Sequence, residues 1–202
     1  MDSKEEVLNQ LGDIHSSLVD KEKFLPYNYN LLIMWGIISA ILYLTFEEVS
    51  KMSIWYALGY IVGVLIIGFL FELYFIRKEN IKYNLQKFTK VQTYIEANYT
   101  FAIVFAVVLT IIFTTNNLIV YAYLSCIFLF GYSDWVSGFI LNNRKFTVVG
   151  LINMSVSLAI FTICILFNPA LIQSSIKYIA VLFSSGGLIY LGISIKKDYE
   201  LV

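Results

Sequence analysis

The sequence is poor in charge, in proline and in histidine. Of its 202 residues only 14% are charged while 59% are hydrophobic, and it has two prolines and one histidine. About a quarter of the residues of a soluble domain are charged, so a soluble fold is excluded. The net charge is zero and no run of Lys or Arg exceeds two residues. These absences argue against nucleic acid as a partner and against a polybasic lipid-binding tail.

Motifs for chemistry are also missing. The sequence has no histidine in an apolar segment, no His/Cys/Asp cluster for a metal, no Gly-rich phosphate loop and no Ser/His/Asp set. Cys126 and Cys164 both lie in apolar segments, where small packing residues are expected rather than a disulfide. We therefore predict a protein that is not an enzyme and that holds neither a metal nor a cofactor.

Long apolar stretches make up most of the chain. Each is long enough to cross a bilayer as a helix, which needs about 20 residues, or slightly short of that length. The fold class predicted is all-α: a polytopic membrane protein with six transmembrane helices in three consecutive hairpins. The spans are expected at about 31–46, 54–76, 99–114, 117–141, 147–167 and 171–195. A membrane domain at 31–197 would then follow an N-terminal region at 1–30 and precede a tail at 198–202.

Two polar segments have an amphipathic pattern. In residues 3–19 an apolar stripe (Val7, Leu11, Ile14, Leu18) recurs at helical spacing, which predicts a short helix that docks on another surface. Residues 77–98 carry a similar stripe with lysines off it. This pattern predicts an amphipathic helix, which can be a continuation of the second span. The helix fits either the membrane interface or a solvated position packed on the N-terminal helix.

Basic residues indicate the orientation. With the N-terminus in the cytosol, twelve of the 14 Lys and Arg residues lie on the cytosolic side, and only Lys51 and Lys177 lie outside. Positive residues are enriched in cytosolic loops, so both termini are predicted to be cytosolic. The composition, rich in Ile, Lys and Asn and poor in Pro, suits a bacterium with an AT-rich genome. We therefore expect the protein in a bacterial cytoplasmic (inner) membrane.

The apolar segments contain a few strongly polar side chains. Asp134 lies about 10 Å before the end of the fourth span, Asn153 lies at a similar depth in the fifth, and Glu72 lies near the end of the second. Residues 142–146 are the only link between the fourth and fifth spans, so Asp134 and Asn153 are expected to face each other. Ser137 and Ser157 lie beside them on the same helix faces. These five residues form the candidate intramembrane polar site.

This candidate site has two interpretations. Intramembrane acids often bind protons or cations, with Asn153 then orienting the ligand. Alternatively, a neutral or paired Asp134 bonds Asn153 and holds the helices together. Replacing Asp134 by Asn would be mild in the second case and would abolish proton-coupled transport in the first. Glu72 has a third interpretation, in which it extends to the interface near Arg77 or Lys78.

Small residues at four-residue spacing predict close helix packing. Gly59 and Gly63 form a G-x-x-x-G motif, and Gly36 pairs with Ala40. Further glycines share the faces of the polar residues in the fourth and fifth spans. They are Gly131, Gly138 and Gly150.

Two functions remain open at this stage. The first is a small non-catalytic accessory, structural or regulatory membrane protein that contacts the lipid bilayer and a second copy or another membrane protein. It predicts an exposed apolar face, on residues 3–19 or around Gly59 and Gly63. The alternative is a small transporter or channel, which predicts a water-accessible cavity reaching Asp134 from the cytosol.

Overall fold

A computed structural model describes residues 29–83 and 90–200 of the chain. These two ranges fold into helices and short connections and contain no strand. Six helical stretches are long and apolar enough to cross a membrane. The predicted all-helical, six-span fold is therefore confirmed. The elements are α2 (Tyr29–Met52), α3 (Ile54–Tyr83), α4 (Lys90–Thr115), α5 (Ile119–Ile140), α6 (Arg144–Leu166), α7 (Ala170–Gln173), α8 (Ile176–Ala180), the π-helical turn η1 (Val181–Ser185) and α9 (Gly186–Glu200).

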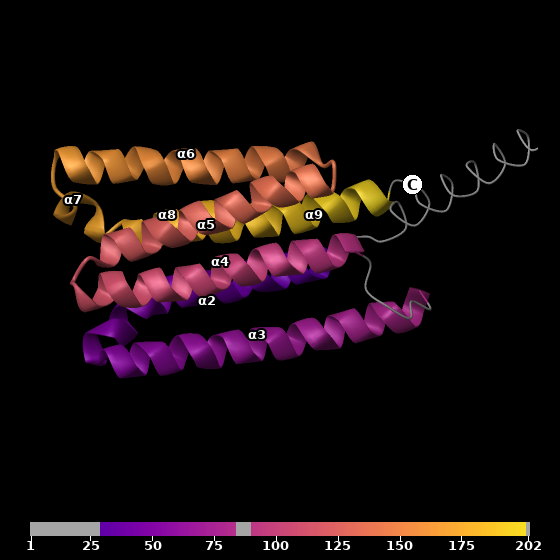
Figure 1. Ribbon diagram of the computed structural model, residues 1–202, viewed down its shortest axis with the longest axis horizontal. Coiled ribbons are helices and arrows are strands. Elements are labelled where there is room, and N and C mark those ends of the chain that lie inside the picture. The colour runs from indigo at the N-terminus through magenta and orange to yellow at the C-terminus, as the bar shows by residue number, and fades with distance from the viewer. Residues whose placement is uncertain (1–28, 84–89, 201–202) are drawn as a thin grey trace, which may run out of the picture.

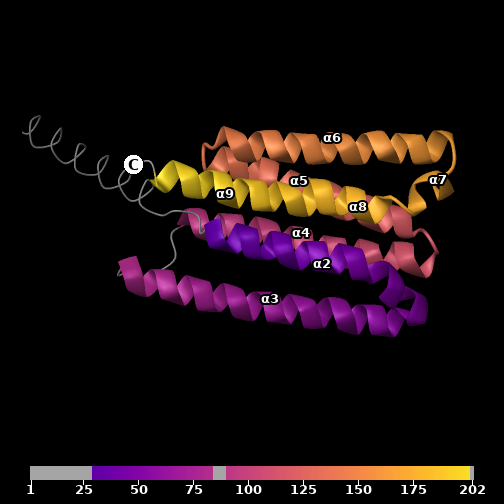
Figure 2. The ribbon, with the colours of Figure 1, turned by 180° about the vertical axis from the view of Figure 1, so that it is seen from behind.

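The spanning helices run up and down in one elongated bundle (Figure 1). One end of the bundle, here called the tail end, holds Tyr29, the connection from α5 to α6 and the end of α9. The other end, the far end, holds the connections from α2 to α3, from α4 to α5 and from α6 to α7 (Figure 2). The long apolar helices expose large apolar side chains such as Ile66, Phe71 and Leu166 along the bundle, as expected for a multi-pass membrane protein.

Asparagines form two of the tight connections. Asn117, after α4, and Asn142, after α5, have φ angles of 58° and 49°, in the left-handed region that asparagine tolerates better than most residues. The Asn143 amide then donates to the Gly138 carbonyl at 2.9 Å, and the Asn143 side chain accepts from the Lys145 amide at 3.0 Å. Asn143 thus caps α6 directly after α5 has ended, which makes the two helices antiparallel neighbours.

Close backbone contact joins α5 to α6, the most extensive helix pair in the bundle. A β-carbon at Gly131 would lie 2.7 Å from Asn153 Cβ, and one at Gly150 would collide with the backbone of Trp135 and Gly131. Gly138 in the same way lies against Thr147. Only glycine allows this separation, so these positions fix how closely the two helices approach.

The last spanning stretch is divided into three parts and packs chiefly on α2. Gly36 of α2 lies against Ile189 and the Ser185 carbonyl, and Gly192 of α9 lies against Ile33 and the Tyr29 carbonyl. The last predicted hairpin is therefore consecutive in the chain, but α9 contacts α2 far more than it contacts α6. The turn η1, between α8 and α9, places the buried Ser184 and Ser185 toward α2.

Helix α3 is the least anchored element. It packs on α2 and meets α4 at only a few positions, and it lies at the edge of the bundle (Figures 1 and 2). It has no extensive contact with α5, α6 or α9. One wall of the bundle thus consists of a helix held mainly by one neighbour.

Several helices are longer than predicted. The first reaches Met52 rather than residue 46, because Lys51 pairs within the same helix with Glu47 at 3.2 Å and with Glu48 at 3.0 Å. The segment 77–98 does not form one separate amphipathic helix within the described residues. Its first part ends α3 and its last part, from Lys90, begins α4. The expected helix at 3–19 lies outside the described residues.

Candidate functional site

Asp134 is completely buried in α5, and its hydrogen-bond partner comes from α4 rather than α6. The Tyr99 hydroxyl donates to Asp134 Oδ1 at 2.6 Å. One residue earlier on each helix, the Asn98 side chain donates to the Ser133 carbonyl at 3.0 Å. Two consecutive residues of α4 thus bind two consecutive residues of α5, which sets the register between these helices.

Asn153 is also buried, at the junction of α5, α6 and α9. It lies against Gly131 of α5, and its side-chain amide would be 3.4 Å from a β-carbon at Gly187 of α9. Ser157, one turn further along α6, donates to the Leu124 carbonyl at 2.9 Å. Asp134 Oδ2, Asn153 Nδ2 and the Ser137 hydroxyl have no hydrogen-bond partner among the described residues. These side chains form a buried polar layer between helices.

The main cavity lies elsewhere, between α2 and α3 on one side and α4 and α5 on the other. Its volume is about 430 Å³, within the range of small-molecule sites. Asp134 and Asn153 do not line it. Tyr99 does, so that its hydroxyl is bound to Asp134 while its ring forms part of the cavity wall. The cavity therefore ends at Tyr99, one side chain short of Asp134.

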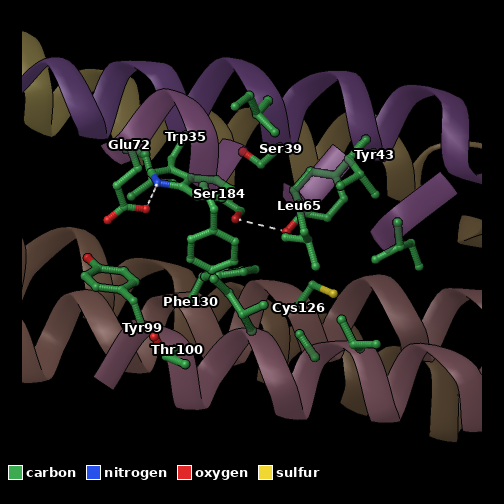
Figure 3. Close-up of a pocket in the computed structure, with 18 of the residues that line it drawn as sticks. Trp35, Ser39, Tyr43, Leu65, Glu72, Tyr99, Thr100, Cys126, Phe130 and Ser184 are labelled. Atoms are coloured by element: carbon green, nitrogen blue, oxygen red, sulfur yellow. Dashed lines mark hydrogen bonds between the residues drawn. The ribbon is translucent and has the colours of Figure 1, made fainter. Parts of the chain in front are cut away.

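Two glutamates lie at the tail-end part of the cavity. Glu72 of α3 accepts a hydrogen bond from Trp35 Nε1 of α2 at 3.1 Å, as Figure 3 shows. The Trp35 ring lies against Gly68, one turn before Glu72, where no side chain obstructs it. Glu72 thus points into the bundle and does not extend toward Arg77 or Lys78. Glu96 of α4 lines the same cavity and makes no hydrogen bond or ion pair with the described residues.

The rest of the cavity is mostly apolar. Figure 3 shows Tyr99, Thr100 and Phe130 on the wall opposite Trp35 and Glu72. Polar groups deeper in the wall already have partners. The Tyr43 and Ser184 hydroxyls lie 3.2 Å apart, Ser39 and Ser185 lie 2.8 Å apart, and Tyr123 donates to the Tyr43 carbonyl at 2.9 Å. The two carboxylates are therefore the charged groups of an otherwise apolar lining.

Three residues of this site, Trp35, Glu96 and Tyr99, were not identified from the sequence. Glu96 was assigned to an amphipathic segment because the third span was expected to begin at residue 99. No spacing in the sequence indicates that Trp35 of α2 meets Glu72 of α3. One signal in the sequence could have indicated this contact. Gly68 and Glu72 lie one helical turn apart on the same face of α3, and the glycine leaves room there for a large side chain of a neighbouring helix.

The glycines Gly59 and Gly63 lie on the outside. A β-carbon at either would have no atom within 4 Å, and neighbouring Tyr56 and Val62 are exposed. Within one copy, this face of α3 has no helix against it. Gly36, Gly131, Gly138 and Gly150, in contrast, all lie at helix contacts.

Groups that could hold a metal are not found in the described part of the chain, where no three His, Cys, Asp or Glu residues come together. Cys126 and Cys164 are not joined in a disulfide, and Cys126 lines the cavity while Cys164 is buried in α6.

Fold and site together define a multi-pass α-helical membrane protein with an apolar cavity that carries two acids. Comparison with known proteins adds no assignment. No family model matches the chain, and no curated protein or solved structure matches it.

Proposed function

We propose that the protein is a small membrane transporter whose binding site is the cavity between α2, α3, α4 and α5. The cavity is the observation that carries this proposal. Glu72 and Glu96 take the role that the sequence suggested for Asp134 and Asn153. A purely structural bundle gains nothing from an open apolar space of this size, because unfilled volume weakens packing.

The arrangement of α3 supports movement. A transporter exposes its site alternately to the two sides of the membrane. The cavity has α3 as one wall, and α3 is held mainly by α2. Phe69 and Leu73 of α3 and Thr100 of α4 line the cavity and are exposed, so the space opens between these two helices. Movement of α3 relative to α4 would change this opening without breaking the contact between α5 and α6 or that between α2 and α9.

The two native cysteines provide a test of the cavity. In Cys164→Ser only Cys126 remains, and it should react with N-ethylmaleimide in native membranes because it lines the cavity. In Cys126→Ser only Cys164 remains, and it should not react, since it is 3% exposed and does not line the cavity. Equal inertness of both thiols would contradict the proposal.

Transport itself requires access from both sides. A membrane-impermeant methanethiosulfonate reagent should modify Cys126 of the Cys164→Ser variant when added to either face of oriented vesicles. Modification from one face only would indicate a static binding site, and the transport proposal would then fail.

A second candidate function has one observation in its favour. The open face around Gly59 and Gly63 suits close packing against a helix of another copy or of another membrane protein. An accessory protein acting through this face predicts that Gly63→Leu abolishes cross-linking between subunits in the membrane while leaving Cys126 reactivity unchanged. Unchanged cross-linking would exclude this face as the contact.

A further inference from the structure

The cavity has a distinctive shape and charge distribution. Its lining on α4 runs from Glu96 to Thr110, a rise of about 21 Å along the helix axis. A volume of about 430 Å³ spread over that length makes a narrow channel rather than a round chamber. The deeper lining, which includes Phe46, Ile61 and Val107, is apolar.

Charge is confined to one end of this channel. Glu72 and Glu96 both lie toward the tail end, and the lining contains no Lys, Arg or His among the residues described. Carboxylates within an apolar segment are costly unless a group of opposite charge compensates them. Glu96 has no partner in the described chain, so the cavity has an uncompensated negative end.

The lining also distinguishes between kinds of cation. A hard metal ion requires about six or more oxygen ligands, which an apolar wall does not supply. An organic ammonium group requires less, because aromatic faces and one or two carboxylates satisfy it. Trp35, Tyr99, Phe69 and Phe130 provide such faces around the two glutamates.

From these observations we propose that the ligand is a single-chain cationic amphiphile, an alkylamine or alkyl quaternary ammonium compound. Its cationic head lies between Glu72 and Glu96, and its alkyl chain extends along the channel past Cys126. This inference rests on the proposed function and specifies its substrate class. Recognition requires no covalent step.

Cys126 reports on occupancy of the channel. The full chain with Cys164→Ser, in nanodiscs of phosphatidylcholine, is treated with N-ethylmaleimide in the presence of dodecyltrimethylammonium or of dodecanoate, at concentrations that leave the nanodiscs intact. The two probes have chains of similar length and opposite charge. We expect the cation to slow Cys126 modification saturably and the anion to leave the rate unchanged.

The glutamates are tested by substitutions that keep their shape. Glu72→Gln retains an acceptor for Trp35 but removes the charge. Glu72→Gln and Glu96→Gln should each raise the half-protecting concentration of the cation roughly tenfold, and the double variant should lose protection. Glu48→Gln changes an exposed side chain at the far end and is the matched control. In this variant the half-protecting concentration of the cation should equal that of the Cys164→Ser protein. The rate without amphiphile should be the same in every variant, which shows that the cavity is intact.

Two results would overturn the inference in distinguishable ways. Equal protection by cation and anion, or full protection in the double variant, would show that the cavity binds amphiphiles without charge recognition, and the proposed function would stand. A Cys126 that is inert even without amphiphile would remove the open cavity itself, and the proposed function would fail together with the inference.

Discussion

At the scale of single residues, the hydroxyl of Tyr99 binds one oxygen of the buried Asp134 carboxyl. This bond is 2.6 Å long, and the other carboxyl oxygen has no partner among the described residues. Tyr99→Phe removes the donor and leaves the carboxyl without it, so we expect a loss of about 1–3 kcal/mol in the free energy of unfolding. Thermal unfolding of the purified protein in detergent measures the loss. Tyr94→Phe is the control, because Tyr94 is 66% exposed and should change stability little. Equal stability of the two variants would show that the Tyr99 bond does not support the fold.

Two glycines that were both predicted to allow close helix packing differ in what surrounds them. At Gly150 a methyl group would collide with the backbone of α5, whereas at Gly63 it would meet nothing within 4 Å. We expect Gly150→Ala to destabilise the protein by about 1–3 kcal/mol through overpacking. Gly63→Ala should be neutral or slightly stabilising, since alanine favours a helix. Chemical unfolding of both variants in the same detergent makes the comparison, and a larger loss at Gly63 would contradict the packing described.

At the scale of helices, an ion pair joins the end of α2 to α8. Lys177 lies 3.4 Å from Glu47, and these two side chains are only 20% and 16% exposed. Glu47→Gln removes this link and the pair with Lys51 together, so we expect a loss of about 1–2 kcal/mol, between the values typical of exposed and of buried pairs. Glu48→Gln, at an exposed side chain, should cost less than about 0.5 kcal/mol. Melting temperatures of the two variants test the difference, and an equal effect of both would refute it.

At the scale of the whole molecule, the two ends of the bundle differ in charge. Lys51 and Lys177 lie at the far end and pair there with Glu47 and Glu48. The other basic residues of the described helices lie toward the tail end, which the positive-inside rule predicts to be cytosolic. We expect an impermeant maleimide to label Ser174→Cys in a background with Cys126→Ser and Cys164→Ser on intact cells. A C-terminal tag should be detected only after permeabilisation. A tag detected on intact cells would reverse the orientation.

The architecture was predictable because span detection depends only on composition over about 20 residues. Helix ends were less predictable. Glu47, Glu48 and Lys51 looked like a polar turn, yet their mutual pairing lets α2 continue through them. The short link between α5 and α6 correctly indicated that these helices are neighbours.

The candidate site depended on information that one sequence does not contain. Loop length indicates which helices are adjacent but not how each is rotated about its axis. Asp134 therefore has its partner on α4, not at Asn153 on α6. The cavity depends on where α3 lies, and α3 is held mainly by α2, where Trp35 lies against Gly68.

The π-helical turn at Val181–Ser185 determines the direction in which each side chain of the last helix points. Such a turn holds one residue more than an α-helical turn of the same span. If these five residues wound as a regular α-helix instead, every later side chain would turn by about 100° around the axis. Gly192 would rotate away from Tyr29 and Ile33, and a bulkier group would arrive against that backbone. The winding of this segment is thus as constrained as its composition, and a regular α-helix here would remove the close contact by which α9 now joins α2.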